Sequence, residues 1–197
     1  FDSDRLEGQN GVDTLYGGSG IDKLVLDVSP VFDPIPEGRF EVFDGHYRNE
    51  PSRPFADDNA TDILVIQGTD SADTILLGQQ NYTLTDNRSA SGLMVSIANS
   101  NFNRVFPSEW RSFDNPQDAN GKPLIEQFQI SGFAGNDTIR FVDTPMNVGS
   151  PTFALLPLDV SDLIARSDDW VGVIEGGSED DTLQGSAARD RIDGGRG

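Results

Sequence analysis

The chain has 197 residues, with 33 acidic side chains against 14 basic ones, a formal net charge of −19 and no cysteine. The absence of cysteine excludes a disulfide scaffold, a thiolate-ligated zinc or iron–sulfur centre and a thiol enzyme. The negative charge opposes contact with phosphate backbones and anionic lipids, so we expect neither nucleic-acid binding nor membrane insertion.

The choice of acidic residue is uneven, because 25 of the 33 acids are Asp. Aspartate, together with 21 Gly and 11 Pro, favours turns over helices. A short carboxylate beside glycine-rich backbone also suits a hard cation that takes oxygen ligands. We therefore expect an all-β protein with little helix, and composition already indicates cation binding.

A nine-residue repeat begins near the N-terminus. After Asp4 the sequence reads GQNGVDTLY over residues 8–16 and GGSGIDKLV over residues 17–25. One aspartate occurs every nine residues, and a leucine follows each aspartate by two positions. These aspartates are Asp4, Asp13 and Asp22.

The middle of the chain alternates short apolar runs with polar, proline-containing segments. Two isolated copies of the repeat occur there, GTDSADTIL over 68–76 and GFAGNDTIR over 132–140. The segment 107–123 is expected to be a loop, and residues 159–166 could form one or two helical turns. Predicted strands cover residues 40–43, 63–66, 74–77, 82–85, 93–97, 128–130, 138–142 and 171–174.

The repeat returns at the C-terminus as GGSEDDTLQ over 176–184 and GSAARDRID over 185–193, followed by GGRG over 194–197. The chain begins at Phe1 without a methionine and stops in mid-repeat. We therefore expect it to be a piece of a longer protein.

Each position of the repeat has a physical role. Glycines at the first, second and fourth positions permit positive φ, so that backbone carbonyls can turn toward one point, and the aspartate adds a carboxylate. The next three residues carry one large aliphatic side chain, as in a very short strand. Three copies place Ser71, Glu179 or Ala188 at the fourth position and so lose a glycine that eases the turn.

The pattern GGxGxDxUx, in which U is a large aliphatic residue, resembles the calcium-binding repeat of RTX proteins. The resemblance covers residues 1–25 and 176–197 and, more loosely, 68–76 and 132–140. It implies Ca²⁺ as cofactor and a right-handed parallel β-roll, with two nonapeptides in each turn of the roll. Between the two blocks of repeats, residues 26–175 form a β-rich middle with degenerate RTX-like turns.

The resemblance also implies where calcium would bind, between loops of successive turns on the same side of the roll. Asp4 and Asp22 would then lie together on one edge of the roll, and Asp13 would lie on the other edge. Asp181 would share an ion with the loop 194–197, while Asp190 would need a following turn. The expected ligand residues are Asp4, Gly8, Asn10, Gly11, Asp13, Gly18, Gly20, Asp22, Asp73, Asp137, Gly177, Asp181, Asp190 and Gly195.

Two folds remain open for residues 26–175. We favour a β-solenoid that continues between the end repeats with longer, irregular rungs. The alternative is a compact β-sandwich inserted between two β-rolls.

The function expected from this resemblance is a non-catalytic, calcium-binding structural or adhesive module. It would belong to a bacterial protein exported by type I secretion and would fold on extracellular calcium. Its partners would be calcium, the flanking repeats of the parent chain and a cell-surface or environmental polysaccharide.

Two alternatives involve carbohydrate. A binding module would use aromatic platforms, for which Trp110, Trp170, Tyr47 and Tyr82 are available. A lyase- or epimerase-like β-helix enzyme would need a base and a cation on one groove. The candidates for that chemistry are His46, Tyr47, Arg104 and Arg111, and no spacing brings them together.

Overall fold

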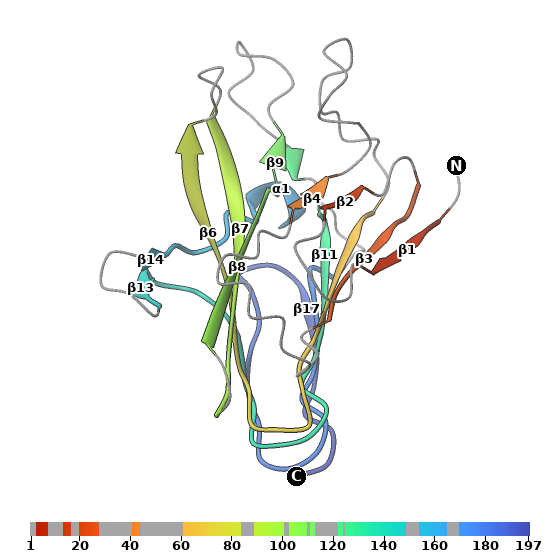
Figure 1. Cartoon of the computed structure of the whole chain (residues 1–197), viewed down its shortest axis with the longest axis vertical. Coiled ribbons are helices and arrows are strands. Elements are labelled where there is room, and N and C mark those ends of the chain that lie inside the picture. The colour runs from red at the N-terminus through yellow and green to blue at the C-terminus, as the bar shows by residue number, and fades with distance from the viewer. Residues whose placement is uncertain are drawn as a thin grey trace.

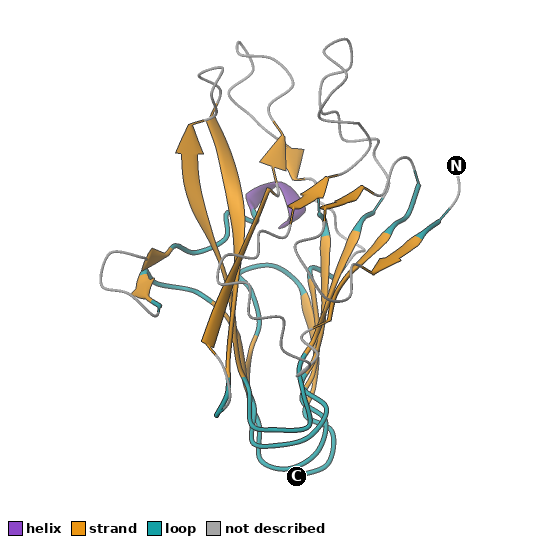
Figure 2. Ribbon diagram, viewed as in Figure 1, coloured by secondary structure: helices purple, strands orange, loops and turns teal. Residues whose placement is uncertain are grey.

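The structure is a computed structural model in which strands predominate and the one described helix is α1 (Ser161–Ile164) (Figure 2). It is all-β, as the composition predicts. The described residues are 3–7, 14–16, 20–27, 41–43, 61–83, 89–100, 103–109, 111–112, 122–123, 125–148, 154–164 and 170–197.

A six-stranded parallel sheet contains strands from both ends of the chain and from its middle (Figure 1). Every neighbouring pair in it is parallel. Its strands, in spatial order, are β1 (Arg5–Glu7), β3 (Lys23–Asp27), β5 (Ile63–Gln67), β11 (Gln127–Ser131), β15 (Gly172–Glu175) and β17 (Asp190–Asp193).

The register of this sheet aligns apolar side chains into rows. Leu24 pairs with Leu64, and Leu64 with Phe128. Two positions further along, an isoleucine row begins with Ile66 and Ile130 and continues through β15 and β17. Because side chains alternate between the faces of a strand, both rows face the same side of the sheet.

A five-stranded sheet lies opposite, with the order β16 (Thr182–Gln184), β12 (Thr138–Phe141), β6 (Thr74–Thr83), β7 (Ser89–Ala98) and β8 (Asn103–Glu109). The first three strands are parallel, and β7 and β8 continue the sheet in antiparallel pairs.

The main core fills the space between the two sheets. Leu64, Phe128 and Ile130 from the six-stranded sheet belong to the same buried cluster as Ile75 and Ile139 from the five-stranded sheet. The ring of Phe128 also meets that of Phe141 edge to face, with centroids 5.6 Å apart. Burial of these apolar surfaces is the main force that holds the sheets together.

Three smaller sheets complete the described structure: β2 (Thr14–Tyr16) with β4 (Glu41–Phe43), β9 (Arg111–Ser112) with β10 (Lys122–Pro123), and β13 (Met146–Asn147) with β14 (Ala154–Leu155). The β13–β14 hairpin contributes to a second core, in which Leu155 lies with Leu76, Met94, Val142 and Val148. Within the described residues, no helix has the length and apolar character needed to cross a membrane.

The predicted strands at 63–66, 93–97, 128–130 and 171–174 are confirmed within one or a few residues. The strand predicted at 74–77 is confirmed, but the predicted break before the strand at 82–85 is wrong, because β6 runs unbroken from Thr74 to Thr83. The polar segment between them is typical of a turn, but its Gln79 is buried and exchanges backbone hydrogen bonds with Leu156. Residues 84–85 lie outside the described structure.

The predicted loop over 107–123 is also wrong in part, since it contains the end of β8 together with β9 and β10. Pro107 suggested a break, yet it pairs opposite Met94. Strand β8 is the outer strand of its sheet, where the missing N–H of a proline is tolerated.

Candidate metal centre in the stacked turns

Short turns connect the two sheets and stack on one another at one end of the molecule (Figure 1). We call residues 68–73, 132–137, 176–181 and 194–197 the lower turns. We call each strand–turn–strand unit of this stack a coil. The N–H groups of the first glycines in three turns donate to carbonyls of the neighbouring coil over 2.8–2.9 Å; these glycines are Gly68, Gly132 and Gly176. The stack continues through Ser178 N–H to Phe133 O (3.0 Å) and Arg196 N–H to Gly177 O (2.8 Å).

The first glycine of a lower turn leaves room for the aspartate of the same turn. A Cβ on Gly132 would collide with Oδ2 of Asp137, and a Cβ on Gly176 would collide with Oδ2 of Asp181. Each carboxylate therefore lies directly against the backbone of its own turn. This close approach explains why the first position of the repeat is glycine.

Two of the lower turns use left-handed backbone at both their second and fourth positions. In residues 132–137 these are Phe133 (φ 72°) and Gly135 (φ 107°), and in 176–181 they are Gly177 (φ 114°) and Glu179 (φ 82°). Glu179 thus keeps the conformation that the missing glycine would have eased. Left-handed backbone at a non-glycine residue costs about 1–2 kcal/mol, so the surrounding structure must offset this strain.

The aspartates of three lower turns form a row that we call the lower row: Asp73, Asp137 and Asp181. Asp73 N–H donates to Oδ1 of Asp137 over 2.7 Å, and Asp137 N–H donates to Oδ1 of Asp181 over 2.9 Å. The Oδ2 atoms of Asp137 and Asp181 are buried and have no hydrogen-bond partner among the described residues. Each of these two carboxylates therefore has one oxygen that accepts no hydrogen bond from the described residues.

Burial raises the pKa of Asp137 to about 6 from its ordinary 3.8, even though the hydrogen bond from the Asp73 backbone opposes the shift. The negative charges of Asp181, Asp73 and Glu179 raise this pKa further. The residue as a whole is 1% exposed. A cation placed here would remove both causes of the shift, because it would neutralise the buried charge and its repulsion.

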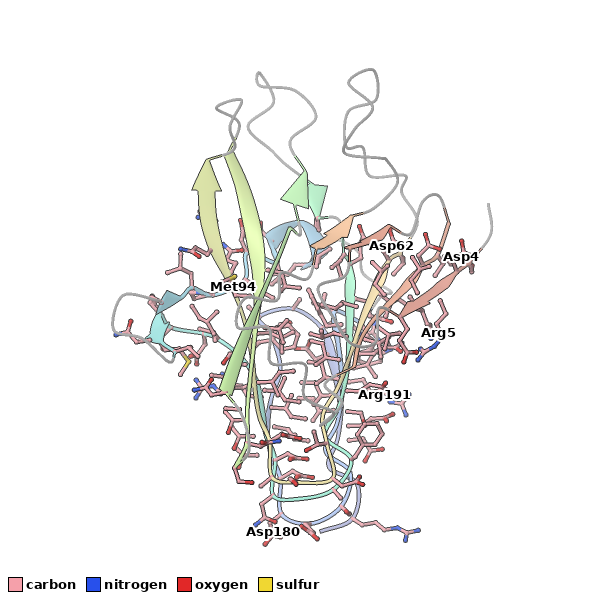
Figure 3. The ribbon with its side chains drawn as sticks, viewed as in Figure 1. Asp4, Arg5, Asp62, Met94, Asp180 and Arg191 are labelled. Atoms are coloured by element: carbon pink, nitrogen blue, oxygen red, sulfur yellow. The ribbon has the colours of Figure 1, made fainter. Side chains whose placement is uncertain are left out.

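A second row of acids lies at the other end of the six-stranded sheet. Figure 3 shows Asp4 and Asp62 at that end, whereas Asp180 lies at the lower turns. Asp4 N–H donates to Oδ1 of Asp22 (2.9 Å), Asp22 N–H to Oδ1 of Asp62 (2.9 Å), and Asp62 N–H to Oε2 of Glu126 (2.8 Å). These four residues form the upper row.

The upper row confirms that Asp4 and Asp22 are neighbours on one edge. Oδ2 of Asp22 is buried without a hydrogen-bond partner among the described residues. Asp62 and Glu126 were not among the expected site residues. The sequence held a signal for both. In the repeat, an aspartate stands two positions before the large aliphatic residue. Asp62 and Glu126 stand in the same way two positions before the core residues Leu64 and Phe128.

The remaining expected ligands divide into three groups. Gly20 and Gly195 have positive φ, 135° and 80°, as a repeat turn requires. Asp73 and Asp190 accept hydrogen bonds from side chains of their own turns. The residues that lie outside the described structure are Gly8, Asn10, Gly11, Asp13 and Gly18, together with His46, Tyr47 and Trp110 of the carbohydrate alternatives.

The described acids are arranged as rows and not as a compact cluster. Within the described ranges, no three His, Cys, Asp or Glu side chains converge in a way that could hold a metal ion by themselves. A cation in these turns would therefore take most of its ligands from backbone carbonyls. Hard divalent cations such as calcium accept such mixed sets of carboxylate and carbonyl oxygens.

Residues 1–24 and 173–197 match the RTX calcium-binding nonapeptide repeat in four copies. The two ends of this chain carry RTX repeats. RTX nonapeptide repeats bind Ca²⁺. The matched segments make up about a quarter of the chain, and they include Asp22 and Asp181 but not Asp73, Asp137 or Glu126. Comparison with curated proteins and with solved structures gave no significant match.

The residues present fit calcium. Buried carboxylate oxygens without a hydrogen-bond partner among the described residues occur on Asp22 and Asp181, inside the matched repeats, and on Asp137, outside them. Asp137 and Asp181 lie over first glycines that admit no side chain. The donor set is oxygen throughout, which is the preference of Ca²⁺.

Proposed function

We propose that this chain is a calcium-dependent structural module whose stacked turns hold Ca²⁺ between neighbouring coils. The observation that carries the proposal is Oδ2 of Asp137, which is buried in a row of aspartates and has no hydrogen-bond partner among the described residues. Burial of this carboxyl raises the pKa of Asp137 to about 6. An unpaired buried carboxylate oxygen costs about 1–3 kcal/mol or more, so a native chain has reason to supply a partner.

The lower row would hold calcium through Asp137 and Asp181, with carbonyl oxygens from the left-handed turns beside them. In the upper row the corresponding atom is Oδ2 of Asp22, which lies next to Asp4 and has no partner within the described part of the chain. Calcium bound at these places supplies positive charge that cancels the repulsion between coils. The chain's own part is to position the carboxylates and to exclude side chains from the glycine backbone.

The charge balance explains why folding would depend on calcium. A net charge of −19 and stacked carboxylates oppose compaction. Extracellular calcium modules bind with dissociation constants of roughly 10⁻⁴ to 10⁻³ M, so the ion would be scarce inside a cell and abundant outside it. One site at about a hundred times its dissociation constant adds about 2.7 kcal/mol to stability, and several sites would act together.

We further propose that the described coils form a β-solenoid of the β-roll kind. The in-register parallel strands β5, β11 and β15 support this, as do the lower turns that lead from them to β6, β12 and β16. In this proposal the chain is an extracellular segment of an exported bacterial protein. It acts as a structural or adhesive extension beside further repeats.

The carbohydrate alternatives gain no support from the described residues. The ring of Trp170 is covered on one side by the guanidinium of Arg189, 4.2 Å from the ring centroid. That face of the indole is therefore not an open platform for a sugar. A calcium-dependent structural scaffold therefore stays our proposal.

The test is a calorimetric calcium titration of the purified chain, followed in parallel by circular dichroism. We expect calcium binding and a gain in β-structure at millimolar calcium. Asp137→Asn should remove one bound calcium ion. The control is Asp143→Asn, which makes the same charge change at an exposed residue outside the turns and should leave the number of bound calcium ions unchanged. Absence of calcium binding by the unmodified chain would overturn the proposal.

A further inference from the structure

Two of the repeat turns differ from the others at the second position. Residues 68–73 read GTDSAD and residues 185–190 read GSAARD, so that a hydroxyl side chain, Thr69 or Ser186, follows the first glycine. We call these the hydroxyl turns. The turns 132–137 (GFAGND) and 176–181 (GGSEDD) carry no hydroxyl at this position, and we call them the left-handed turns.

The hydroxyl of Thr69 closes its turn onto Asp73. Thr69 N–H and Thr69 Oγ1 both donate to Oδ2 of Asp73, over 2.6 and 2.9 Å. Ser71 N–H donates back to Thr69 Oγ1 over 3.2 Å. The other oxygen, Oδ1, accepts from Asn99 Nδ2 over 2.9 Å. Both carboxylate oxygens of Asp73 are therefore hydrogen-bonded within the protein.

Ser186 reproduces this arrangement in a different place in the fold. Ser186 N–H donates to Oδ2 of Asp190 over 2.7 Å, and Ser186 Oγ lies 3.0 and 3.1 Å from the two carboxylate oxygens. Ala188 N–H donates to Ser186 Oγ over 3.0 Å, and Gly172 N–H donates to Oδ1 of Asp190 over 2.8 Å. The same network thus occurs twice, in turns that share no strand.

The backbone separates the two kinds of turn as clearly as the side chains do. The left-handed turns have positive φ at their second and fourth residues, and their aspartates keep a buried Oδ2 without a partner among the described residues. Among the corresponding residues of the hydroxyl turns, Thr69, Ser71, Ser186 and Ala188, none has positive φ. Their carbonyls consequently point in different directions from those of the left-handed turns.

We propose that the hydroxyl turns are calcium-free versions of the repeat, and that Thr69 and Ser186 determine which turns bind the ion. This inference rests on the proposed calcium function and deepens it. In a hydroxyl turn, an N–H and an O–H supply the positive partial charge that a cation supplies in a left-handed turn. Donors that already occupy the carboxylate leave the cation no favourable place.

The position of the first hydroxyl turn gives it a role in the stack. Asp73 N–H donates to Asp137, so the hydroxyl turn packs against the first left-handed turn of the lower row. The hydroxyl turn therefore lies at the end of the calcium-binding part of the row. Its aspartate is fully hydrogen-bonded without the ion. Asp73 and Asp190 then serve as structural acceptors, and the calcium ligands are Asp137 and Asp181.

The experiment compares the number of bound calcium ions in four single variants of the whole chain, measured by calorimetric titration. Asp137→Asn and Asp181→Asn should each lower the number or weaken affinity at least tenfold. Asp73→Asn and Asp190→Asn should leave both unchanged. Loss of an ion from either of the last two variants would overturn the inference while leaving the proposed function intact.

A second pair of variants keeps the test decisive if an Asn variant misfolds. Thr69→Val keeps the side-chain shape but removes the hydroxyl, and should lower the melting temperature equally in calcium and in chelator. Thr69→Gly with Ser71→Gly restores glycine at both positions and should add one calcium ion. No added ion, or a calcium affinity lowered by Thr69→Val, would contradict the inference. An unmodified chain that binds no calcium would instead overturn the proposed function.

Discussion

The lower and upper rows are built from the same hydrogen bond, a backbone N–H donated to the acid of the next coil, but they differ in the turns that carry them. The lower row stands on six-residue turns with glycine at their first positions. The upper row passes from Asp22 to Asp62 and Glu126 across 40 and 64 residues, without the GGxG sequence before the last two.

The difference indicates that stacking of acids and binding of calcium are separable properties. Register in the six-stranded sheet is sufficient to stack an acid, whatever the length of the connection that precedes it. Calcium binding also needs the left-handed turn and a carboxylate oxygen left without a donor. We therefore expect the lower row to depend on calcium more strongly than the part of the upper row beyond Asp22.

Calcium removal should have the largest effect. If two or more sites each contribute about 2.7 kcal/mol at saturation, chelation should lower the melting temperature by about 10–20 °C in a chain of this size. Hydrogen exchange should show the greatest loss of protection at 132–137 and 176–181. An equal loss of hydrogen-exchange protection in both rows would contradict the expectation that the lower row depends more strongly on calcium.

Gly132→Ala should damage the lower row. Its Cβ would collide with the carboxylate of Asp137, which is confined by its own coil, and we expect a loss of about 2–3 kcal/mol. Gly194→Ala is the matched control, because a Cβ at the first position of the last turn meets nothing within 4 Å. Chemical denaturation in calcium measures both, and equal effects would refute the steric explanation.

Glu126→Ala tests the upper row. It removes the acceptor of the Asp62 N–H, and an unsatisfied buried donor costs about 1–3 kcal/mol. No GGxG sequence precedes Glu126, so we expect no calcium there. The loss of folding free energy should therefore be the same in calcium and in chelator. A loss that occurs in calcium alone would place an ion at Glu126 and make the two rows alike.

The pH dependence should separate the calcium-free from the calcium-loaded chain. The pKa of Asp137 in the folded chain is about 6, above the ordinary 3.8 of an unfolded chain. Its contribution to stability in chelator is therefore fully present below about pH 3.8 and is lost as pH rises through about 6. Calcium reverses this trend, because the ion binds the ionised carboxylate.

Thermal melts between pH 4.5 and 7.5, with and without chelator, measure the effect. Asp137→Asn should flatten the slope in chelator, since it removes the titrating group. A slope that survives this substitution unchanged would assign the titration to another acid.

The smallest effect is expected from Phe133→Gly. Phe133 has φ 72° and is 44% exposed, so glycine should relieve about 1 kcal/mol of backbone strain while losing little packing. Thr69→Gly is the contrasting change in a hydroxyl turn, and it should destabilise because it removes a hydrogen bond. Thermal melts in calcium should show opposite signs for the two variants.

Local sequence rules predicted most of the strands and the chemistry of the turns. The apolar runs around Leu64, Val95 and Ile130 form strands because short β-branched and aliphatic segments between turn residues favour extended backbone. The continuous strand β6 was not predicted, because its polar centre is stabilised by Leu156, a residue far away in sequence.

The site was predictable to a similar extent. The nine-residue phase identified Asp137 and Asp181, which end the turns 132–137 and 176–181, and the family comparison supports calcium for the end repeats. Their role as calcium ligands stays a prediction. The phase alone did not distinguish Asp73 from Asp137, although Ser71 replaces the fourth glycine in the turn of Asp73. Which carboxylate oxygens accept hydrogen bonds depends on where the donors of Thr69 and Asn99 lie in space.

The amino-acid sequence alone determined that this is a turn-rich, all-β chain whose aspartates and glycines are spaced to bind a hard cation. Such properties follow from backbone φ preferences and side-chain alternation, which act within a few residues. The tertiary structure decided which acids become neighbours and which of them keep a free oxygen. Hydrogen bonds between coils depend on sheet register across long connections, and no local spacing encodes that register.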